Sequence, residues 1–288
     1  MEDIFLCLDV GGTEIKAGAV GSNGALFNPI RYFPARANED AQTLLAHLTS
    51  ILMEIRVLHS TIAGVRLAFP GPFDYQEGIC LLQGLAKYDH LYGVNLRQEL
   101  SLRMNIAPEK IRFANDASAF ALGEMGFGQA KNAARALFVC IGTGCGSAFG
   151  MNGILAPGGT SGVPMSGCLY DVPFLDSCID DYLSRRGLMA LTMERLGEEL
   201  DGKALAQRVQ QGDEQARLCF FTFGQRIRDA LLPFLKEFEP EVLCFGGQIT
   251  RSAALFLQPI ADVCRERGIR LYITEDTSVR TLQGLTRI

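Results

Sequence analysis

The sequence predicts an α/β protein built from two related lobes. Two strand–turn–strand segments follow the same plan, IFLCLDVGGTEIKAGAV at residues 4–20 and ALFVCIGTGCGSAFGM at residues 136–151. Phe5-Leu6-Cys7-Leu8 in the first corresponds to Phe138-Val139-Cys140-Ile141 in the second, and each run enters a turn of Gly and Thr. A duplicated α/β unit explains both halves.

The remaining elements follow from apolar spacing. Residues 39–56 have helical spacing, and residues 62–72 predict a buried strand that ends at a Pro-Gly turn. A long helix is predicted from about Asp213 to Phe238. The strand VLCFGGQI and a helix near residues 251–268 come after it.

Lobe boundaries are harder to place, because no Pro- or Ser-rich linker interrupts the chain. We expect the first lobe to span residues 1–117, joined by residues 279–288, and the second to span residues 118–278. The junction near Asp116 is predicted to be a hinge within compact structure. Ligands of such folds usually bind between the lobes.

The composition indicates a globular protein with a small-molecule partner. Of 288 residues, 48% are hydrophobic and 20% are charged, which is enough apolar material for one large domain or two modest ones. Lys and Arg total 27 against 32 Asp and Glu, a formal charge of −5. This balance provides no basic field for nucleic acid or an anionic membrane, so we expect neither partner.

The predicted location is the cytoplasm. The opening MEDIFLCLDV has acids where a signal peptide carries positive charge. No uninterrupted apolar stretch approaches the roughly 20 residues needed to cross a bilayer. Nine cysteines without a paired spacing favour reduced thiols over disulfides.

DVGGT and IGTGCG are candidate phosphate-binding loops, because glycines let backbone N–H groups approach phosphate oxygens and a Thr hydroxyl adds a donor. The residues predicted to face the phosphates are Gly11, Gly12, Thr13, Gly142, Thr143, Gly144 and Gly146. Asp9 can reach a water molecule of a Mg²⁺ ion. The alternative is that both are tight hairpin turns that bind nothing. Their equivalent places, and a third glycine turn in FGGQI, favour nucleotide binding.

FANDASAFALGE, at residues 113–124, leads from an apolar run into the first turn of a predicted helix. Asp116 there has two interpretations. It is either the N-cap of the helix, accepting hydrogen bonds from unpaired N–H groups, or a base that takes a proton from a substrate.

Six motifs in order, LDVGGTEIKAG, AFPGP, ANDASAFALGE, IGTGCG, PGGTSG and LCFGGQI, resemble the ROK sugar kinases over nearly the whole chain. The resemblance implies an actin/hexokinase-like fold, a duplicated ribonuclease H-like unit with a ligand cleft between the lobes. It further implies that the protein is a homodimer that uses ATP and Mg²⁺ to phosphorylate a hexose or hexose derivative.

The resemblance also implies roles for individual residues. Asp116 matches the family's catalytic base, and Asn115 would hydrogen-bond a sugar hydroxyl. Gly246 and Gly247 would lie beside the adenosine. Glu124 matches the acidic residue that ends the motif and is a candidate substrate contact, although a Glu further along a helix is more often behind the site or on the surface.

The resemblance breaks between residues 160 and 187. Where the family commonly carries Glu-x-Gly-His, this chain has Gly162 and Met165, so one sugar-contacting carboxylate and one zinc-binding imidazole are absent. Cys168 and Cys178 remain, but two cysteines without a CxxC pair make a poor tetrahedral site. We do not expect zinc.

Two more positions concern the sugar. CIDDYLS places Asp180 where relatives have a sugar-binding Glu, or else its acids favour a helix N-terminus through the dipole. Lys87 stands where relatives present an Asn, and either faces an anionic or amino sugar or is a solvated lysine. Tyr88 and Asp89 are equally plausible contacts.

The main hypothesis is therefore an ATP-dependent sugar kinase. A sugar-responsive transcription regulator of the same family would carry a helix-turn-helix before the first glycine loop, and here Ile4 already begins the strand. A catalytically silent relative is suggested by residues 162 and 165, and the presence of Asp116 argues against it.

Overall fold

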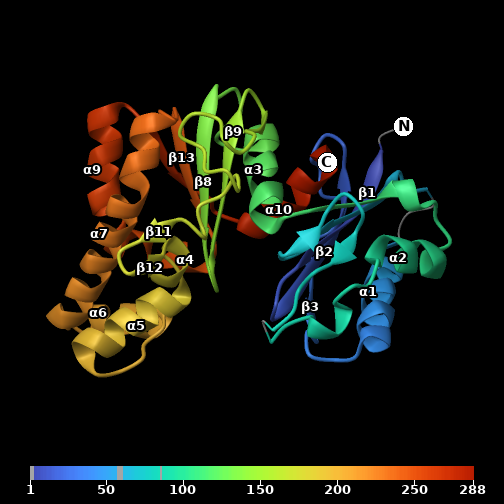
Figure 1. The fold of residues 1–288 in the computed structure, drawn as a ribbon, viewed down its shortest axis with the longest axis horizontal. Helices are drawn as coiled ribbons and strands as arrows, with labels where there is room; N and C mark the ends of the chain where they lie inside the picture. The colour runs from blue at the N-terminus through green and yellow to red at the C-terminus, as the bar shows by residue number, and fades with distance from the viewer. Residues whose placement is uncertain (1–2, 57–60, 85) are drawn as a thin grey trace. The chain divides into compact units, whose positions relative to one another are not determined.

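The computed structural model describes residues 3–56, 61–84 and 86–288 and forms two compact units (Figure 1). Unit 1 contains Met1–Gly128 and Ser278–Ile288, and unit 2 contains Gln129–Thr277. The C-terminal segment thus belongs to the same unit as the N-terminal strands.

Unit 1 is built on a five-stranded sheet of order β3-β2-β1-β4-β7. Strand β1 pairs antiparallel with β2 and parallel with β4, and β4 pairs parallel with β7. The strands are β1 (Ile4–Val10), β2 (Glu14–Gly21), β3 (Arg31–Pro34), β4 (Gly64–Ala68) and β7 (Ile111–Ala114), with a small hairpin of β5 (Phe73–Asp74) and β6 (Ile79–Cys80). The helices are α1 (Ala41–Arg56), α2 (Leu96–Met104), α3 (Asp116–Phe127) and α10 (Thr277–Gly284), with short 3₁₀ turns η1 (Asp89–Leu91), η2 (Pro108–Lys110) and η4 (Leu285–Arg287).

Unit 2 repeats this plan in a sheet of order β10-β9-β8-β13-β14, in which β8 pairs antiparallel with β9 and parallel with β13. Its strands are β8 (Arg135–Ile141), β9 (Cys145–Met151), β10 (Ile154–Leu155), β13 (Val242–Gly246) and β14 (Arg270–Ile273). A separate two-stranded antiparallel sheet consists of β11 (Pro173–Phe174) and β12 (Ser177–Cys178). Its helices are α4 (Ile179–Tyr182), α5 (Arg185–Leu196), α6 (Gly202–Gln210), α7 (Glu214–Glu237), α8 (Ala253–Phe256) and α9 (Gln258–Arg267), with the 3₁₀ turn η3 (Gln248–Ser252). The predicted duplication is confirmed.

The two faces of β1 pack against different layers, because successive side chains of a strand point to opposite sides. Leu6 and Leu8 belong to the core that includes α1 and α2, whereas Phe5 and Cys7 pack with residues of α3 and the C-terminal segment. Asp9 continues the alternation of Phe5 and Cys7. The strand pattern therefore directs its carboxylate toward the α3 side.

Helices α3 and α10 cross with their backbones in contact. A Cβ on Gly123 would stand 2.7 Å from the carbonyl carbon of Arg280 and overlap its oxygen, and a Cβ on Gly284 would overlap Ala119 in the same way. This crossing holds α3 in unit 1, so the boundary lies after Gly128 and not at the predicted residue 117.

The helix predicted near residues 251–268 is divided into η3, α8 and α9. Pro259 lies at the start of α9, where its missing N–H costs no intrahelical hydrogen bond. A proline favours the beginning of a helix. Because the apolar spacing is continuous through this segment, the sequence pattern did not reveal that a new helix begins there.

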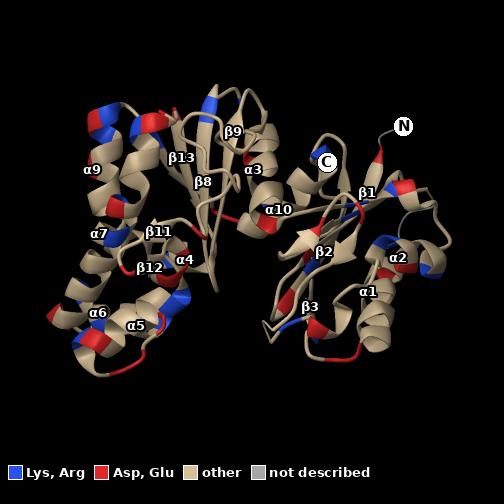
Figure 2. Ribbon diagram, in the orientation of Figure 1, with Lys and Arg blue, Asp and Glu red and all other residues tan. Residues whose placement is uncertain are grey.

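Charged residues lie mainly on the helices and loops of each unit, and acids and bases are interspersed along them in the view of Figure 2. Within the described parts of the chain, no helix has both the length and the apolar character needed to cross a bilayer.

Candidate functional site

In unit 1 the chemistry-bearing residues gather where parallel strands end. Strands β1, β4 and β7 run in one direction, so their carboxyl ends meet at one edge of the sheet. Asp9 is the penultimate residue of β1, and Asn115 and Asp116 directly follow β7. The predicted residues Asp9, Asn115 and Asp116 are thus brought to the same edge.

The first glycine loop connects β1 to β2. The N–H of Gly11 donates to the Glu14 carbonyl at 3.0 Å, and a Cβ on Gly11 would lie 2.8 Å from that oxygen, so the turn requires glycine. Gly12 and Thr13 are exposed. The loop therefore presents backbone N–H groups and a hydroxyl to solvent, as a phosphate site requires.

Lys16 pairs with Asp9 beside this loop, with its Nζ 2.9 Å from Oδ2. Partial burial lowers the pKa of Lys16, but the charge of Asp9 and their hydrogen bond outweigh it and raise the pKa. A cation is thus fixed next to the predicted phosphate loop. Sequence reasoning missed Lys16, although it follows Thr13 by three residues in the same motif.

Tyr88 supports the loop from within the core. Its side chain is fully buried, and its hydroxyl donates to the Gly11 carbonyl at 2.7 Å. Burial, helped by the charge of Asp9, raises the pKa of the phenol, so the hydroxyl stays a donor. The structure does not support a contact between Tyr88 and the sugar, because the side chain has no exposed surface.

Asn115, rather than Asp116, is the N-cap of α3. Its Oδ1 accepts from the N–H groups of Ala117 at 3.0 Å and Ser118 at 3.3 Å, and its Nδ2 lies 3.4 Å from the Tyr75 hydroxyl. Asp116 is the first helical residue, and its Oδ1 accepts from Ala117 N–H at 2.9 Å. The capping oxygen of Asn115 is thereby engaged, which leaves its amide nitrogen for other polar groups.

The environment of Asp116 adjusts its acidity. The side chain is exposed, yet the surrounding protein atoms desolvate the carboxyl and raise its pKa, and the charge of Asp9 adds to the rise. The Ala117 N–H and the charge of Lys87 oppose it. An accessible carboxylate with a raised pKa has the property expected of a general base.

Lys87 lies over the first glycine loop. Its Cδ would be 3.4 Å from a Cβ on Gly12, and its positive charge acts to lower the pKa of Asp116. The side chain is half-buried. Lys87 therefore joins the predicted group of Gly12 and Asp116, on a backbone held by the adjacent Tyr88.

Glu124 is not brought to this group. Its side chain is 1% exposed, and its Oε1 is 3.3 Å from Nε of Arg280 on α10. It lies two turns along α3 from Asp116, inside the α3–α10 crossing. A contact between Glu124 and substrate is therefore not supported, because a buried, paired carboxylate serves the packing of unit 1.

The second glycine loop joins β8 to β9 in unit 2. It is closed by a hydrogen bond from Gly142 N–H to the Gly144 carbonyl at 2.9 Å, and Thr143 is exposed. Apart from its two chain neighbours, no atom of the described residues lies within 4 Å of where a Cβ on Gly142 would stand. The loop has open backbone on this side, and Gly146 follows within β9, opposite Cys140.

The third glycine turn adjoins the second, because β8 and β13 are parallel neighbours. Gly246 ends β13, and Gly247 has a φ of 94° with its Cα packed against Ile141 at the end of β8. Its N–H donates to Oγ1 of Thr277 at 2.9 Å. Only glycine fits there.

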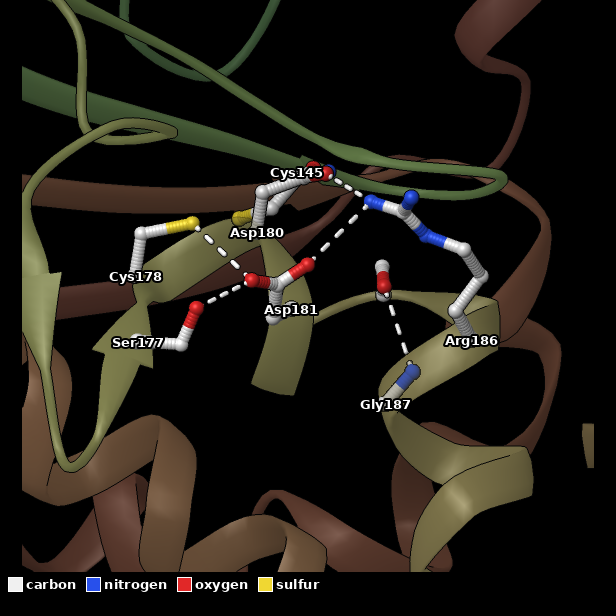
Figure 3. A network of polar contacts seen from close by, with 8 residues as sticks. Cys145, Ser177, Cys178, Asp180, Asp181, Arg186 and Gly187 are labelled. Carbon is white, nitrogen blue, oxygen red and sulfur yellow. Dashed lines mark hydrogen bonds and ion pairs between the residues drawn. The ribbon is translucent and has the colours of Figure 1, made fainter.

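Asp180 binds the second glycine loop through the backbone (Figure 3). Its Oδ1 accepts from Cys145 N–H, and its Oδ2 pairs with Arg186. The prediction that Asp180 is a sugar ligand is not supported, since both oxygens have protein partners. Arg186 was missed, because its role depends on a fold contact that no local pattern reveals.

Gly162, the position at which the family resemblance implies a Glu, is closed to any side chain. Its φ is 76°, and a Cβ would lie 2.6 Å from Cα of Phe238, which is buried at the end of α7. Met165, the position at which the resemblance implies a His, is 85% exposed. The departure at Gly162 is thus built into the backbone of this segment.

We therefore expect Gly162→Glu to destabilise unit 2 by about 3 kcal/mol, because a positive φ and an overlap with Phe238 act together. Urea unfolding followed by circular dichroism measures the change. Met165→His is the control and should leave the midpoint unchanged, since Met165 is exposed. A Gly162→Glu variant as stable as the native protein would show that the loop can rearrange to admit the carboxylate.

Among residues 3–56, 61–84 and 86–288, no group of three or more His, Cys, Asp or Glu side chains is arranged to hold a metal ion. Cys168 and Cys178 are both partly buried, and all nine cysteines, every one of them described, are free thiols.

Comparison with known proteins places this arrangement in a family. The sequence model of the ROK family matches residues 5–279. The chain belongs to the ROK family. N-acetyl-D-glucosamine kinase of Aliivibrio salmonicida is 25% identical to this chain over 270 residues, covering 88% of this chain and 87% of that protein. Glucokinase of Thermotoga maritima is 23% identical over 277 residues, covering 88% and 85%.

Solved ROK structures share the fold. The ROK hexokinase from Thermus thermophilus matches with a TM-score of 0.82 at 20% identity, covering 99% of this chain and 97% of that chain. A ROK glucokinase from Streptomyces griseus, in complex with glucose and AMPPNP, matches at 0.75 and 19%, covering 99% and 98%. A ROK transcriptional regulator, a homologue of the E. coli MLC protein, matches at 0.79 and 16%, covering 99% and 78%. The fold is therefore the actin/hexokinase-like fold of ROK proteins.

Proposed function

We propose that this ROK protein is a sugar kinase that transfers a phosphoryl group from ATP to a hexose or hexose derivative, with Asp116 as the general base. The observation that carries the proposal is the exposed carboxylate of Asp116, with its raised pKa, on the sheet edge that also bears the first glycine loop. Phosphoryl transfer needs a group that accepts the proton of the attacking hydroxyl.

The acceptor side of the reaction is assigned to unit 1. One oxygen of Asp116 is fixed by Ala117 N–H, which orients the carboxylate while it receives the proton. The amide nitrogen of Asn115 is the polar group next to it that can bind a sugar hydroxyl, because its oxygen caps α3. Lys87 adds a positive charge near Asp116 and Gly12, where we propose that negative charge moves during transfer.

The donor side is assigned to the glycine loops. ATP with Mg²⁺ supplies the phosphoryl group and neutralises part of its charge. In unit 1 the exposed Thr13, and in unit 2 the open backbone at Gly142 and the exposed Thr143, each fit phosphate oxygens, since they offer donors without bulk. Gly246 and Gly247 are proposed to lie beside the adenosine. Asp9 already pairs with Lys16, so any contact with Mg²⁺ is through water on its remaining surface.

The relatives named as N-acetylglucosamine kinase and glucokinase favour a neutral hexose or N-acetylhexosamine as acceptor. Lys87 distinguishes this chain within the acceptor site that we propose, and in unit 2 the position of Gly162 is closed to the Glu that the family resemblance implies. We therefore include acidic and amino sugars among the candidates.

The proposal is tested by ADP release from Mg-ATP across hexoses, N-acetylhexosamines, and acidic and amino sugars, with a phosphorylated product identified by mass spectrometry. Turnover on one class of sugar supports it. ADP release at the same rate without sugar would instead identify a hydrolytic ATPase. Nucleotide or sugar binding without any product would contradict kinase activity for the sugars tested.

A catalytically silent ligand-binding relative is the second candidate. The observation in its favour is the loss of both the Glu and the His at Gly162 and Met165, and the regulator of the same fold shows that ROK proteins serve more than one purpose. Calorimetry that detects sugar binding by a protein with no turnover would favour it.

A further inference from the structure

The second glycine loop is held at both ends by the segment that contains α4 and α5. At one end, the N–H of Arg185 donates to the Gly142 carbonyl at 2.9 Å. At the other, Oδ1 of Asp180 accepts from the N–H of Cys145 at 2.5 Å and lies 2.8 Å from where a Cβ on Gly144 would stand. Since glycine lets the carboxylate pack directly on the loop, Asp180 determines the position of its last turn.

This arrangement places a negative charge beside a loop that we propose to bind phosphates. An uncompensated carboxylate a few ångströms from a polyphosphate repels it strongly, because both partners are only partly screened by water. The side chain of Asp180 is 21% exposed, so solvent screens it incompletely. The loop needs a cation at this point.

Arg186 supplies that cation. Its guanidinium pairs with Oδ2 of Asp180 and lies 3.6 Å from Oδ1 of Asp181. Figure 3 shows the guanidinium facing both carboxylates. Asp181 is itself held by Ser177 and Cys178, and the hydrogen bonds from these two side chains lower the pKa of its carboxyl. Arg186 is therefore fixed by two carboxylates while 64% of its side chain remains exposed.

We propose that Asp180 is a positioning residue of the second glycine loop, and that Arg186 compensates its charge so that the loop accepts nucleotide phosphates. This inference rests on the proposed function and gives Asp180 a different role from the sugar contact that the resemblance implied. The guanidinium also offers N–H groups in a planar fork that suits a phosphate.

The test is a double-mutant cycle on nucleotide affinity, measured by calorimetry without sugar. Arg186→Gln should weaken ATP binding about tenfold, because the charge of Asp180 is left uncompensated. Adenosine, which has no phosphate, should bind as it does to the native protein. Asp180→Asn should retain ATP affinity, since Asn Oδ1 can still accept from Cys145 N–H. The double variant should bind ATP more tightly than Arg186→Gln alone.

Arg208→Gln is the matched control, because Arg208 also bridges two carboxylates of unit 2, Glu198 and Asp213, each at 3.2 Å. It should leave ATP affinity unchanged. Equal ATP affinity of Arg186→Gln and the native protein overturns the inference, as does equal weakening for ATP and adenosine. A raised KM for sugar in Asp180→Asn, with ATP affinity intact, restores the sugar-ligand role. A native protein that binds no nucleotide overturns the proposed function as well, so the two failures are distinguishable.

Discussion

Replacing Asp116 with Asn is expected to lower kcat by about 100- to 10,000-fold, the range that a general base contributes. The amide can still accept the Ala117 N–H that Oδ1 accepts in the native protein, so α3 should begin as before. What is lost is the ability to take a proton. The KM values for ATP and sugar should change little, because the variant removes an interaction made during transfer.

The pH dependence of the native enzyme provides an independent check. A carboxyl with a raised pKa stays protonated to a higher pH, and the protonated form cannot accept a proton. Activity should therefore fall as the pH decreases through a value above that of an ordinary Asp, and Asp116→Asn should lose this acidic limb.

The control is Asp213→Asn, which changes the N-cap carboxylate of α7 to an amide that can still cap. Its kcat should equal that of the native protein. An Asp116→Asn variant that keeps full kcat would show that another group accepts the proton and that Asp116 serves only the first turn of α3.

The second large effect is expected from Gly123→Ala, at the crossing of α3 and α10. The added methyl group would stand 2.7 Å from the carbonyl carbon of Arg280, and backbone cannot move aside as a side chain can. We expect the free energy of unfolding of unit 1 to fall by about 3 kcal/mol, despite the higher helix propensity of Ala. Denaturant unfolding followed by circular dichroism measures it.

Gly126→Ala, on the same helix, is the matched control. Its methyl group would meet the side chain of Arg287, with Cδ at 2.6 Å, and a flexible arginine can turn away. The stability should change by less than about 1 kcal/mol. Similar losses of stability in the two variants would contradict this prediction. They would mean that the cost of replacing glycine comes from the geometry of α3 itself and not from its contact with α10.

The sequence predicted the elements whose signals are local. The two glycine turns follow apolar strands, so both hairpins and their repetition were recognised, and the N-terminal strand was placed within a residue of β1. Asn115 and Asp116 were correctly placed at the start of a helix. Both residue types can cap a helix, so the sequence alone does not decide which of the two is the cap. In the structure the cap is Asn115.

Residues with distant partners could not be predicted. Glu124 is paired with Arg280, and Asp180 is hydrogen-bonded to Cys145, in both cases across long stretches of chain. A family motif assigns a position to each, but the contact that determines its role arises only when α10 meets α3, or when α4 meets β9. For the same reason, unit 1 extends to residue 128 and not to the predicted residue 117.

The return of residues 278–288 to unit 1 also bears on the order in which the protein folds during synthesis. The partners that α3 needs, Arg280 and Gly284, leave the ribosome only after all of unit 2 has been made. Unit 2 is continuous in sequence and can fold as soon as it emerges, whereas unit 1 must wait, although its chain is made first. The packing of α3, the helix that begins at Asp116, is therefore completed last.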